Sequence, residues 1–300
     1  MNILAFESSC DETAVAVVRD GRQVLSDAIL SQADMHALYG GVVPEIASRK
    51  HVQAITALTD KALSDAGLTK KDIDAVAVTY APGLIGAVLV GVSFAKSAAY
   101  ALGVPLIPVH HVRGHIAANY LAFPELEPPF TALAISGGNT LIVDVADYTD
   151  MTVLGATRDD AAGECFDKAA RVLGLAYPGG KLMDALARQG RADARLFPRP
   201  YLDNDNLDFS FSGLKTAVTS YVHQVLPDQP WPHPLQDTAD APQALKDCCA
   251  SFNLAVVETI ATKVERALAA NPDLDLLIMA GGVAANSLLR ERMAQLMEKR

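Results

Sequence analysis

Aromatic residues and cysteine are both scarce in this sequence. Phe, Trp and Tyr make up 6% of the residues, whereas half of all residues are hydrophobic. A core of Ala, Val, Leu and Ile is therefore expected. The cysteines show neither metal-ligand nor disulfide spacing, and the adjacent Cys248 and Cys249 are typical of small apolar residues in a helix. These features argue against a disulfide-stabilised secreted domain.

Long apolar runs are missing as well. No run reaches the roughly 18 residues that a membrane-spanning helix needs. The first residues, MNIL, lack the basic start, apolar stretch and cleavage site of a signal peptide. Together with the cysteine usage, these absences predict a cytoplasmic protein without a membrane contact.

Positive charge is in deficit over the whole chain, because the formal net charge is -10. Such a chain does not attract nucleic acid through its overall field. Residues 158–215, however, hold nine Lys/Arg against nine Asp/Glu, so this window is neutral. It can form a local basic face or a merely solvated helical surface, and the sequence leaves both interpretations open.

One order of elements occurs twice in the sequence. A short strand, a small polar turn, a Thr-led strand and a further strand are expected at residues 3–30 and again at 131–154. The repeat predicts a duplicated α/β domain, with domains at residues 1–129 and 130–300. The turn at residues 136–139 (SGGN) suits phosphate binding by backbone N–H groups, although most such turns are ordinary hairpins.

The remaining pattern consists of helices and buried strands. We expect helices at residues 44–67, 86–101, 163–173, 181–188 and 243–269, buried strands at 74–79, 104–109 and 274–279, a strand leading into a helix at 209–215, and an exposed loop with the single Trp at 226–242. The glycines at 83 and 86 allow either close approach to a ligand or tight helix packing. A Gly-Gly turn at 281–282 leads into a final helix and suits a nucleotide contact.

Paired histidines stand at the start of a predicted helix. His111 and His115 are four residues apart, a spacing that puts both imidazoles on one helix face, while His110 would point elsewhere. Two imidazoles make an incomplete metal site, because a metal ion needs at least a third ligand. The alternative is a pair of histidines bonded to backbone or water.

The motifs in combination resemble the TsaD family of tRNA adenosine threonylcarbamoyltransferases, long described as O-sialoglycoprotein endopeptidases. The resemblance covers nearly the whole chain and rests on ESSCDET (7–13), YGGVVPE (39–45), HHVRGH (110–115), DAAGE with FDK (160–168), DFSFSGLK (208–215) and MAGGV (279–283). It implies two ribonuclease-H-like α/β domains of the actin/hexokinase/Hsp70 class, with a ligand cleft between them.

The resemblance also implies a reaction. The threonylcarbamoyl group passes from threonylcarbamoyl-AMP to N6 of the adenosine 3′ of the anticodon, in tRNAs that read codons starting with A, and AMP leaves. Asp11 and Glu12 match acidic positions that matter for activity. The adenylate would be held by residues that match the phosphate loop and the sugar and base contacts: Ala134, Ile135, Ser136, Gly137, Gly138, Asp167, Gly180, Asp184 and Asn286.

A divalent metal ion and several partners follow from the same resemblance. His111 and His115 match ligands of iron, with zinc as the alternative. The family's third ligand is an Asp in a Thr-Asp-Asn segment beyond Arg300, so the second domain is expected to be truncated and the ligand set incomplete. The implied partners are tRNA, the smaller paralogue TsaB as a heterodimer partner, and the ATPase TsaE.

Other functions remain as alternatives. A metalloendopeptidase would need a general base beside the metal, as in His-Glu-x-x-His, but Val112 and Arg113 stand between these histidines. A sugar or acid kinase of the same fold would use a carboxylate base and magnesium. A non-catalytic scaffold of the same fold is the third alternative.

Overall fold

A computed structural model describes residues 1–226, 228–229, 231–272 and 275–300. The chain divides into two compact units, Met1–Leu126 and Glu127–Arg300. The domain boundary expected at 129/130 lies close to this division.

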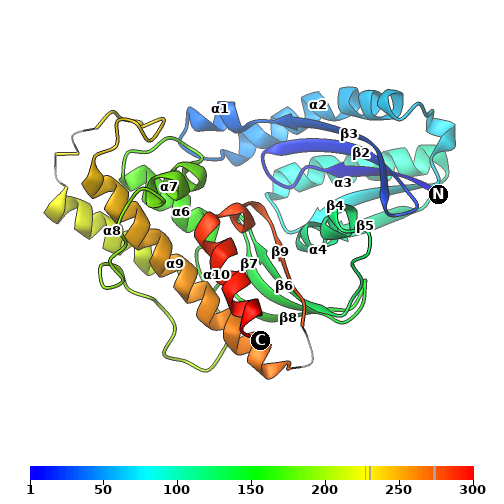
Figure 1. Cartoon of the computed structure of the whole chain (residues 1–300). Coiled ribbons are helices and arrows are strands. Elements are labelled where there is room, and N and C mark those ends of the chain that lie inside the picture. The colour runs from blue at the N-terminus through cyan, green and yellow to red at the C-terminus, as the bar shows by residue number, and fades with distance from the viewer. Residues whose placement is uncertain (227, 230, 273–274) are drawn as a thin grey trace. The chain divides into compact units, whose positions relative to one another are not determined.

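The first unit is built on a five-stranded sheet in the order β3-β2-β1-β4-β5 (Figure 1). The strands are β1 (Asn2–Glu7), β2 (Glu12–Arg19), β3 (Gln23–Ser31), β4 (Ala75–Ala81) and β5 (Leu106–His110). β1, β2 and β3 form an antiparallel meander, whereas β4 runs parallel to β1 and β5 parallel to β4. Burial alternates along β2, where Thr13, Val15 and Val17 are fully buried, as expected when one face of a sheet is packed.

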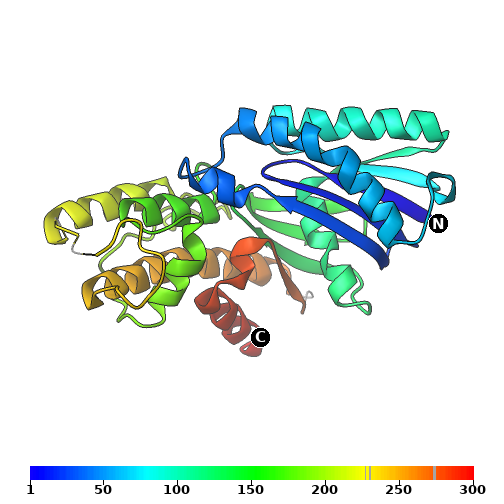
Figure 2. The ribbon, with the colours of Figure 1, turned by 90° about the horizontal axis from the view of Figure 1, so that it is seen from above.

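Two long helices, α2 (Pro44–Asp65) and α3 (Ile85–Leu102), lie side by side and contact the strands of this sheet (Figure 2). Pro44 starts α2, where its missing N–H costs no hydrogen bond, and Gly103 ends α3 in the left-handed conformation. The shorter helices of the unit are α1 (Ala33–Ala37), η1 (Lys70–Asp72), α4 (His111–Ala117) and α5 (Asn119–Ala122).

Small residues bring the start of α3 and the turn before it close to α2 and to the loop that follows β1. A Cβ on Gly83 would lie 2.6 Å from the Ser9 carbonyl oxygen, and one on Gly86 would lie 2.5 Å from Ser48 Oγ. The small-residue stripe of α3, Ala87, Gly91, Ala95 and Ala99, is buried within the unit. Of the two roles that the sequence left open for these glycines, the structure therefore shows tight helix packing.

α3 contains no uninterrupted apolar run of 18 residues, as expected, because Ser93, Lys96 and Ser97 interrupt it. Among the described residues, this one 18-residue helix is nevertheless long and apolar enough to cross a membrane by length and composition. Its mean hydropathy is 1.6, and 28% of it is buried. The mean hydropathy of the helix stays high despite its two serines and Lys96. Core helices pass the same test, and α3 contacts β4, β1 and α2 in its own unit.

The second unit carries a four-stranded sheet in the order β8-β7-β6-β9. The strands are β6 (Phe130–Ile135), β7 (Thr140–Val145), β8 (Met151–Ala156) and β9 (Leu277–Ala280). β6, β7 and β8 form an antiparallel meander and β9 runs parallel to β6, which repeats the arrangement of β1 to β4. The strand repeat predicted from the sequence is therefore present in both sheets.

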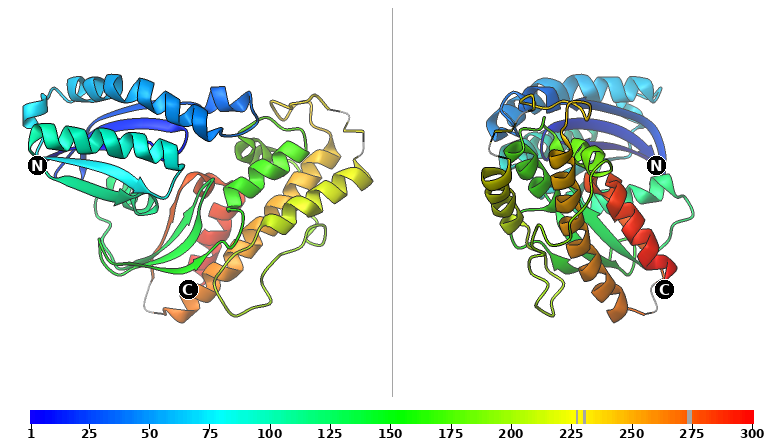
Figure 3. Two further views of the ribbon diagram at one scale, coloured as in Figure 1. Left: turned by 180° about the vertical axis from the view of Figure 1, so that it is seen from behind. Right: turned by 60° about the vertical axis from the view of Figure 1, so that its left-hand side comes forward.

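The helices of the second unit surround α9 (Gln243–Ala270), which contacts α7 and α10 (Figure 3). Cys248 and Cys249 are fully buried in α9, as predicted. The other helices are α6 (Ala162–Val172), α7 (Gly179–Ala187), α8 (Ser212–Val225), η2 (Gly282–Ala285) and α10 (Ser287–Glu298).

Two predictions for this unit are wrong in part. Trp231, expected in an exposed loop, is only 4% exposed, because its indole packs in the core and its Nε1–H donates to the Leu173 carbonyl oxygen at 2.9 Å. The strand expected before α8 is reduced to one bridge between Thr157 and Phe209. Residues 227 and 230 of the loop, and the predicted strand start at 274, lie outside the described residues.

Candidate active site

The paired histidines lie on one short helix, as their spacing predicts. α4 begins directly after β5, and the ring centroids of His111 and His115 are 4.4 Å apart, with an interplanar angle of 79°. The His110 ring makes an edge contact with Tyr80 instead. The strand-to-helix junction thus brings two of the three imidazoles together.

Glu7, at the end of β1, contacts His111 across 104 positions of sequence. Its Oε2 lies 3.1 Å from His111 Nδ1 and accepts a hydrogen bond from Thr79 Oγ1 at 2.6 Å, while Oε1 accepts from the Ser9 backbone N–H. Burial alone would raise the pKa of Glu7, but these hydrogen bonds outweigh it and lower the pKa to about 2. The carboxylate is therefore ionised at neutral pH.

The histidine pair has the donor chemistry of a metal site. Burial, the largest cause, and the neighbouring His111 lower the pKa of His115, so that its imidazole is neutral at pH 7 as a metal ligand must be. Imidazole nitrogens suit iron and zinc. Within the described parts of the chain, no group of three or more His, Cys, Asp or Glu side chains could hold a metal ion. The residues present thus fit a metal with two imidazoles and leave its other ligands to be supplied from elsewhere.

The acidic turn before β2 lies next to this network in sequence. Asp11 is half-buried and Glu12 is exposed, and the turn is held by the buried His51. The two ring nitrogens of His51 bond Thr13 Oγ1 at 2.8 Å and the Cys10 carbonyl oxygen at 2.9 Å. The turn is therefore well fixed.

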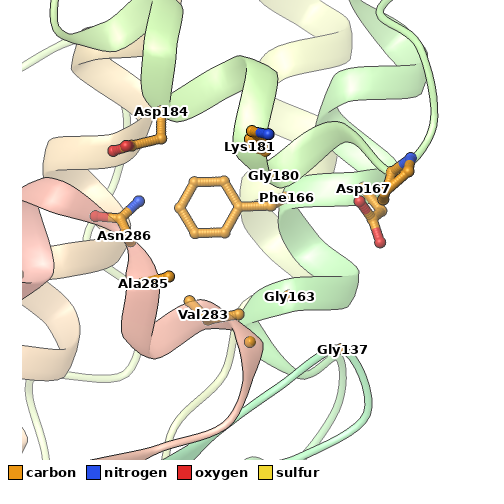
Figure 4. A pocket seen from close by; sticks show the side chains of 12 residues that line it. Gly137, Gly163, Phe166, Asp167, Gly180, Lys181, Asp184, Val283, Ala285 and Asn286 are labelled. Atoms are coloured by element: carbon orange, nitrogen blue, oxygen red, sulfur yellow. The ribbon is translucent and has the colours of Figure 1, made fainter. Parts of the chain in front are cut away.

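A pocket of 480 Å³ opens in the second unit, between α6, α7 and the turn after β9 (Figure 4). Glycine backbone, apolar side chains and a few polar groups line it, a composition that suits a flat, partly polar ligand. The lining residues are Gly137, Gly163, Phe166, Asp167, Pro178, Gly180, Lys181, Asp184, Gly282, Val283, Ala285 and Asn286.

The polar side chains of this pocket also hold its walls. Asp167 Oδ1 accepts from the Gly179 N–H at 2.8 Å, and Asp184 Oδ1 accepts from Ser287 Oγ at 2.7 Å. Burial raises the pKa of Asp167, although hydrogen bonds from the start of α7 act in the opposite direction. Asn286 Oδ1 caps α10 by accepting from the Leu289 N–H at 3.0 Å. These hydrogen bonds thus hold the walls of the pocket in place.

The predicted adenylate residues divide into two groups. Gly137, Asp167, Gly180, Asp184 and Asn286 all line the pocket. The others are not among its lining residues: Ala134, Ile135, Ser136 and Gly138. The first two are buried in β6 with 2% and 1% exposure, so their side chains serve the core and their strand places the loop.

Gly281 explains why the turn after β9 needs glycine. Its φ is +95°, and a Cβ there would lie 2.4 Å from the Ile135 carbonyl oxygen. No residue with a side chain fits this conformation and this contact together. The Gly-Gly pair therefore brings η2 against the end of β6, where Val283 and Ala285 reach the pocket.

Sequence reasoning missed several residues of both sites. Glu7 opens the motif ESSCDET, but nothing in the sequence pairs it with His111. Phe166 and Lys181 line the pocket although neither was a candidate. The neighbouring candidates Asp167 and Gly180 were the only signal that could have pointed to them.

Comparison with known proteins identifies the family of this chain. The family model described as "TsaD: tRNA N6-adenosine threonylcarbamoyltransferase" matches residues 23–300. A protein of that name from Desulfovibrio desulfuricans is 57% identical over 300 residues, which cover 100% of this chain and 82% of the relative. Namesakes from Moorella thermoacetica and Clostridium perfringens are 53% and 51% identical and are covered over 82% and 84% of their length.

Solved structures show the same fold at low identity. Component A of the (R)-2-hydroxyglutaryl-CoA dehydratase of Acidaminococcus fermentans matches with a TM-score of 0.53 and 13% identity, over 98% of this chain and 88% of that one. The ROK hexokinase of Thermus thermophilus matches with a TM-score of 0.51 and 15% identity, over 100% and 90%. The fold is thus the expected α/β fold of the actin/hexokinase/Hsp70 class. With the family model and relatives above half identity over the full chain, this protein belongs to the tRNA N6-adenosine threonylcarbamoyltransferase family.

Proposed function

We propose that this protein transfers the threonylcarbamoyl group from threonylcarbamoyl-AMP to N6 of the adenosine 3′ of the anticodon, in tRNAs that read codons starting with A. The observation that carries the proposal is the pocket of the second unit, whose lining contains five of the residues expected to hold an adenylate. Because the substrate is a tRNA, we also propose that the protein acts in the cytoplasm.

The reaction needs an activated carbonyl and a stabilised leaving group. The N6 amine is a weak nucleophile, because its lone pair is delocalised into the adenine ring. In the transfer, N6 bonds the carbamoyl carbon, the bond from that carbon to the phosphate oxygen breaks, AMP leaves and N6 loses a proton. The pocket would hold the adenylate in a fixed orientation toward the attacking N6 amine. Such positioning accounts for a large part of the catalysis of group transfer.

Residues of the pocket have distinct roles in this proposal. Asp167 and Asp184 each keep carboxylate lone pairs that can accept ribose hydroxyl hydrogens. Backbone N–H groups of Gly137 and Gly138 would position the phosphate, whereas the Ser136 N–H donates to the Asn139 carbonyl oxygen at 2.8 Å. Lys181, which also lines the pocket, adds a positive charge near an anionic ligand.

His111 and His115 would hold the metal ion, iron or alternatively zinc. When bound, such an ion supplies Lewis acidity toward a carbonyl or phosphoryl oxygen. Asp11 and Glu12 lie on the turn after Ser9, whose hydroxyl is 3.1 Å from His111 Nδ1, and we assign them to catalysis at this site.

The metallopeptidase alternative lacks a group that its chemistry requires. A zinc peptidase of the His-Glu-x-x-His type uses a glutamate next to its first histidine, but Val112 follows His111 here and is buried. Glu7 cannot replace that base, because its Oε2 is already engaged by His111 and Thr79. The transferase remains the function that these residues support best.

Replacing Asp167 by Asn tests the adenylate pocket. The amide oxygen can still accept from the Gly179 N–H, but the charged acceptor for a ribose hydroxyl is lost. Because a hydrogen bond to a charged group contributes about 1.5–3 kcal/mol, the Kd of AMP should rise about tenfold or more. Isothermal titration calorimetry with AMP measures this.

Asp150→Asn is the matched control, because Asp150 is exposed in the turn before β8 and outside the pocket lining. AMP should bind this variant as it binds the original protein. Equal AMP affinity in both variants would show that Asp167 holds no adenylate. The activity itself is tested by mass spectrometry of tRNA treated with the protein and its partners, where absence of threonylcarbamoyladenosine would refute the transferase assignment.

The partners TsaB and TsaE belong to this proposal. The small residues of Val88 to Ala99 would permit close approach of a partner helix, but the smallest of them face the interior of the unit. The exposed face of α3 instead presents Ile85 and Leu89, which are 82% and 56% exposed. We therefore assign the paralogue contact to these larger side chains.

A further inference from the structure

Every described contact of the Glu7 carboxylate is with a hydrogen-bond donor or with a ring nitrogen. The Ser9 backbone N–H donates to Oε1 at 2.5 Å, and Thr79 Oγ1 donates to Oε2 at 2.6 Å. His111 Nδ1 lies 3.1 Å from the same Oε2. The Ser9 N–H can only donate, so the side of the carboxylate that faces Ser9 must be an acceptor.

The position of Glu7 decides which nitrogen of His111 carries the proton. A neutral imidazole has one N–H and one nitrogen with a free lone pair, and an ionised carboxylate can only accept. Oε2 therefore requires the proton on Nδ1, which leaves the lone pair on Nε2. Ser9 Oγ is also 3.1 Å from Nδ1, but a hydroxyl donates or accepts equally well and so does not select a tautomer.

We propose that Glu7 is a positioning residue of the histidine site, which holds His111 in the Nδ1–H tautomer so that Nε2 is free to bind the metal ion. The inference rests on the metal site of the proposed function. A carboxylate behind a ligating histidine fixes both the tautomer and the ring orientation, and its loss typically lowers metal affinity 10- to 100-fold.

Glu7→Gln reverses the hydrogen-bond polarity at almost constant size. The Ser9 N–H keeps the amide oxygen at the position of Oε1, so the amide NH2 takes the position of Oε2. Thr79 can accept this new donor with its hydroxyl. His111 Nδ1 must then also accept a hydrogen bond from the amide NH2. The ring proton therefore moves to Nε2 and blocks the nitrogen that would bind the metal.

The tautomer can be measured without metal, by two-bond ¹H–¹⁵N correlation spectra of the ¹⁵N-histidine-labelled protein at about pH 8, where an ordinary imidazole is neutral. His111→Ala assigns the signals. We expect the Nδ1–H pattern for His111 in the original protein and the Nε2–H pattern in Glu7→Gln. An Nε2–H pattern in the original protein overturns the inference, whether or not the variant folds.

Metal affinity is measured in parallel by competition titration with Zn(II) and Fe(II). Glu7→Gln should bind 10- to 100-fold more weakly. Glu258→Gln is the matched control, because this half-buried glutamate pairs with Arg292 in the second unit, far in sequence from either histidine. Equal affinity in Glu7→Gln and Glu258→Gln would refute the positioning role. No metal binding by the original protein would refute the metal site, while the tautomer measurement still decides the role of Glu7.

Discussion

At the scale of single residues, the lack of a side chain at Gly91 allows α3 to pack closely against the loop after β1. A Cβ on Gly91 would collide with Ser8 Oγ, and Ser8 is 1% exposed. Ser8 cannot turn away without losing its hydrogen bond to the Ala87 carbonyl oxygen at 2.9 Å. The absence of a side chain at Gly91 is therefore a packing requirement of the first unit.

We expect Gly91→Ala to lower the free energy of unfolding by about 1–3 kcal/mol, because overpacking of a buried contact outweighs the better helix propensity of alanine. Urea denaturation at 25 °C measures the change. Gly114→Ala is the matched control, since Gly114 lies in α4 with nothing within 4 Å of an added Cβ. Equal stability of the two variants would show that the Ser8 contact relaxes freely.

At the scale of elements, α8 begins on a carboxylate from a distant part of the chain. Asp159 accepts from Ser210 Oγ at 2.6 Å, from the Phe211 N–H at 2.8 Å, and from both the N–H and the Oγ of Ser212. Asp208 similarly accepts from the Ala156 N–H at 3.0 Å. The motif at 208–215 has no role that the sequence alone reveals. In the structure it joins α8 to β8 and to the loop before α6.

Removal of this cap should destabilise the protein in a pH-dependent way. Burial acts to raise the pKa of Asp159, but its hydrogen bonds outweigh this and lower it. Because the folded-state pKa lies below the unfolded value of about 3.9, the stabilisation is complete above that value and is lost as the pH falls through the folded pKa. We expect Asp159→Ala to lose about 1–2 kcal/mol at pH 7, and the difference from the original protein to shrink as the pH falls below the unfolded pKa.

Urea denaturation over this pH range measures the effect, and Asp150→Ala in the exposed turn before β8 is the control. The control should follow the stability of the original protein at every pH. A difference for Asp159→Ala that stays constant from neutral to acid pH would mean that the charge of the carboxylate does not matter.

At the scale of the whole molecule, an acidic chain has to recognise an acidic polymer. The net charge of -10 opposes tRNA binding by the chain alone, so binding must use a local basic surface or a partner. Arg195 and Arg199 are exposed residues of the neutral window at 158–215. We place them on the path of the tRNA.

Charge reversal of both residues, Arg195→Glu with Arg199→Glu, should weaken tRNA binding by the assembled complex about tenfold and reduce its salt dependence, because fewer phosphate contacts release fewer counterions. AMP binding should not change. Binding titrations at several salt concentrations measure both effects. Lys71→Glu with Lys299→Glu, which changes the net charge equally at other exposed sites, is the control. An unaltered affinity and salt slope in the arginine variant would move the tRNA surface elsewhere.

The strand repeat of the two sheets and much of the local structure follow from the sequence alone. The strand repeat is periodic in sequence, so each meander follows from alternating burial and turn residues, as at Asp20-Gly21. The approach of His111 to His115 follows from helix geometry alone, because residues four apart share a face. Such features depend on neighbours within a few positions of the chain.

Contacts between groups far apart in the sequence depend on the tertiary structure. Glu7 contacts His111 across 104 positions. The buried Trp231 indole donates a hydrogen bond to the carbonyl oxygen of Leu173, 58 positions away. The hydrophobic and hydrogen-bonding potential of these residues is visible in the sequence, but their partners are chosen by the packing of whole elements. The physical reason is that local propensities act over a turn of helix or strand, whereas a buried polar group is satisfied by whichever donor or acceptor the fold places beside it.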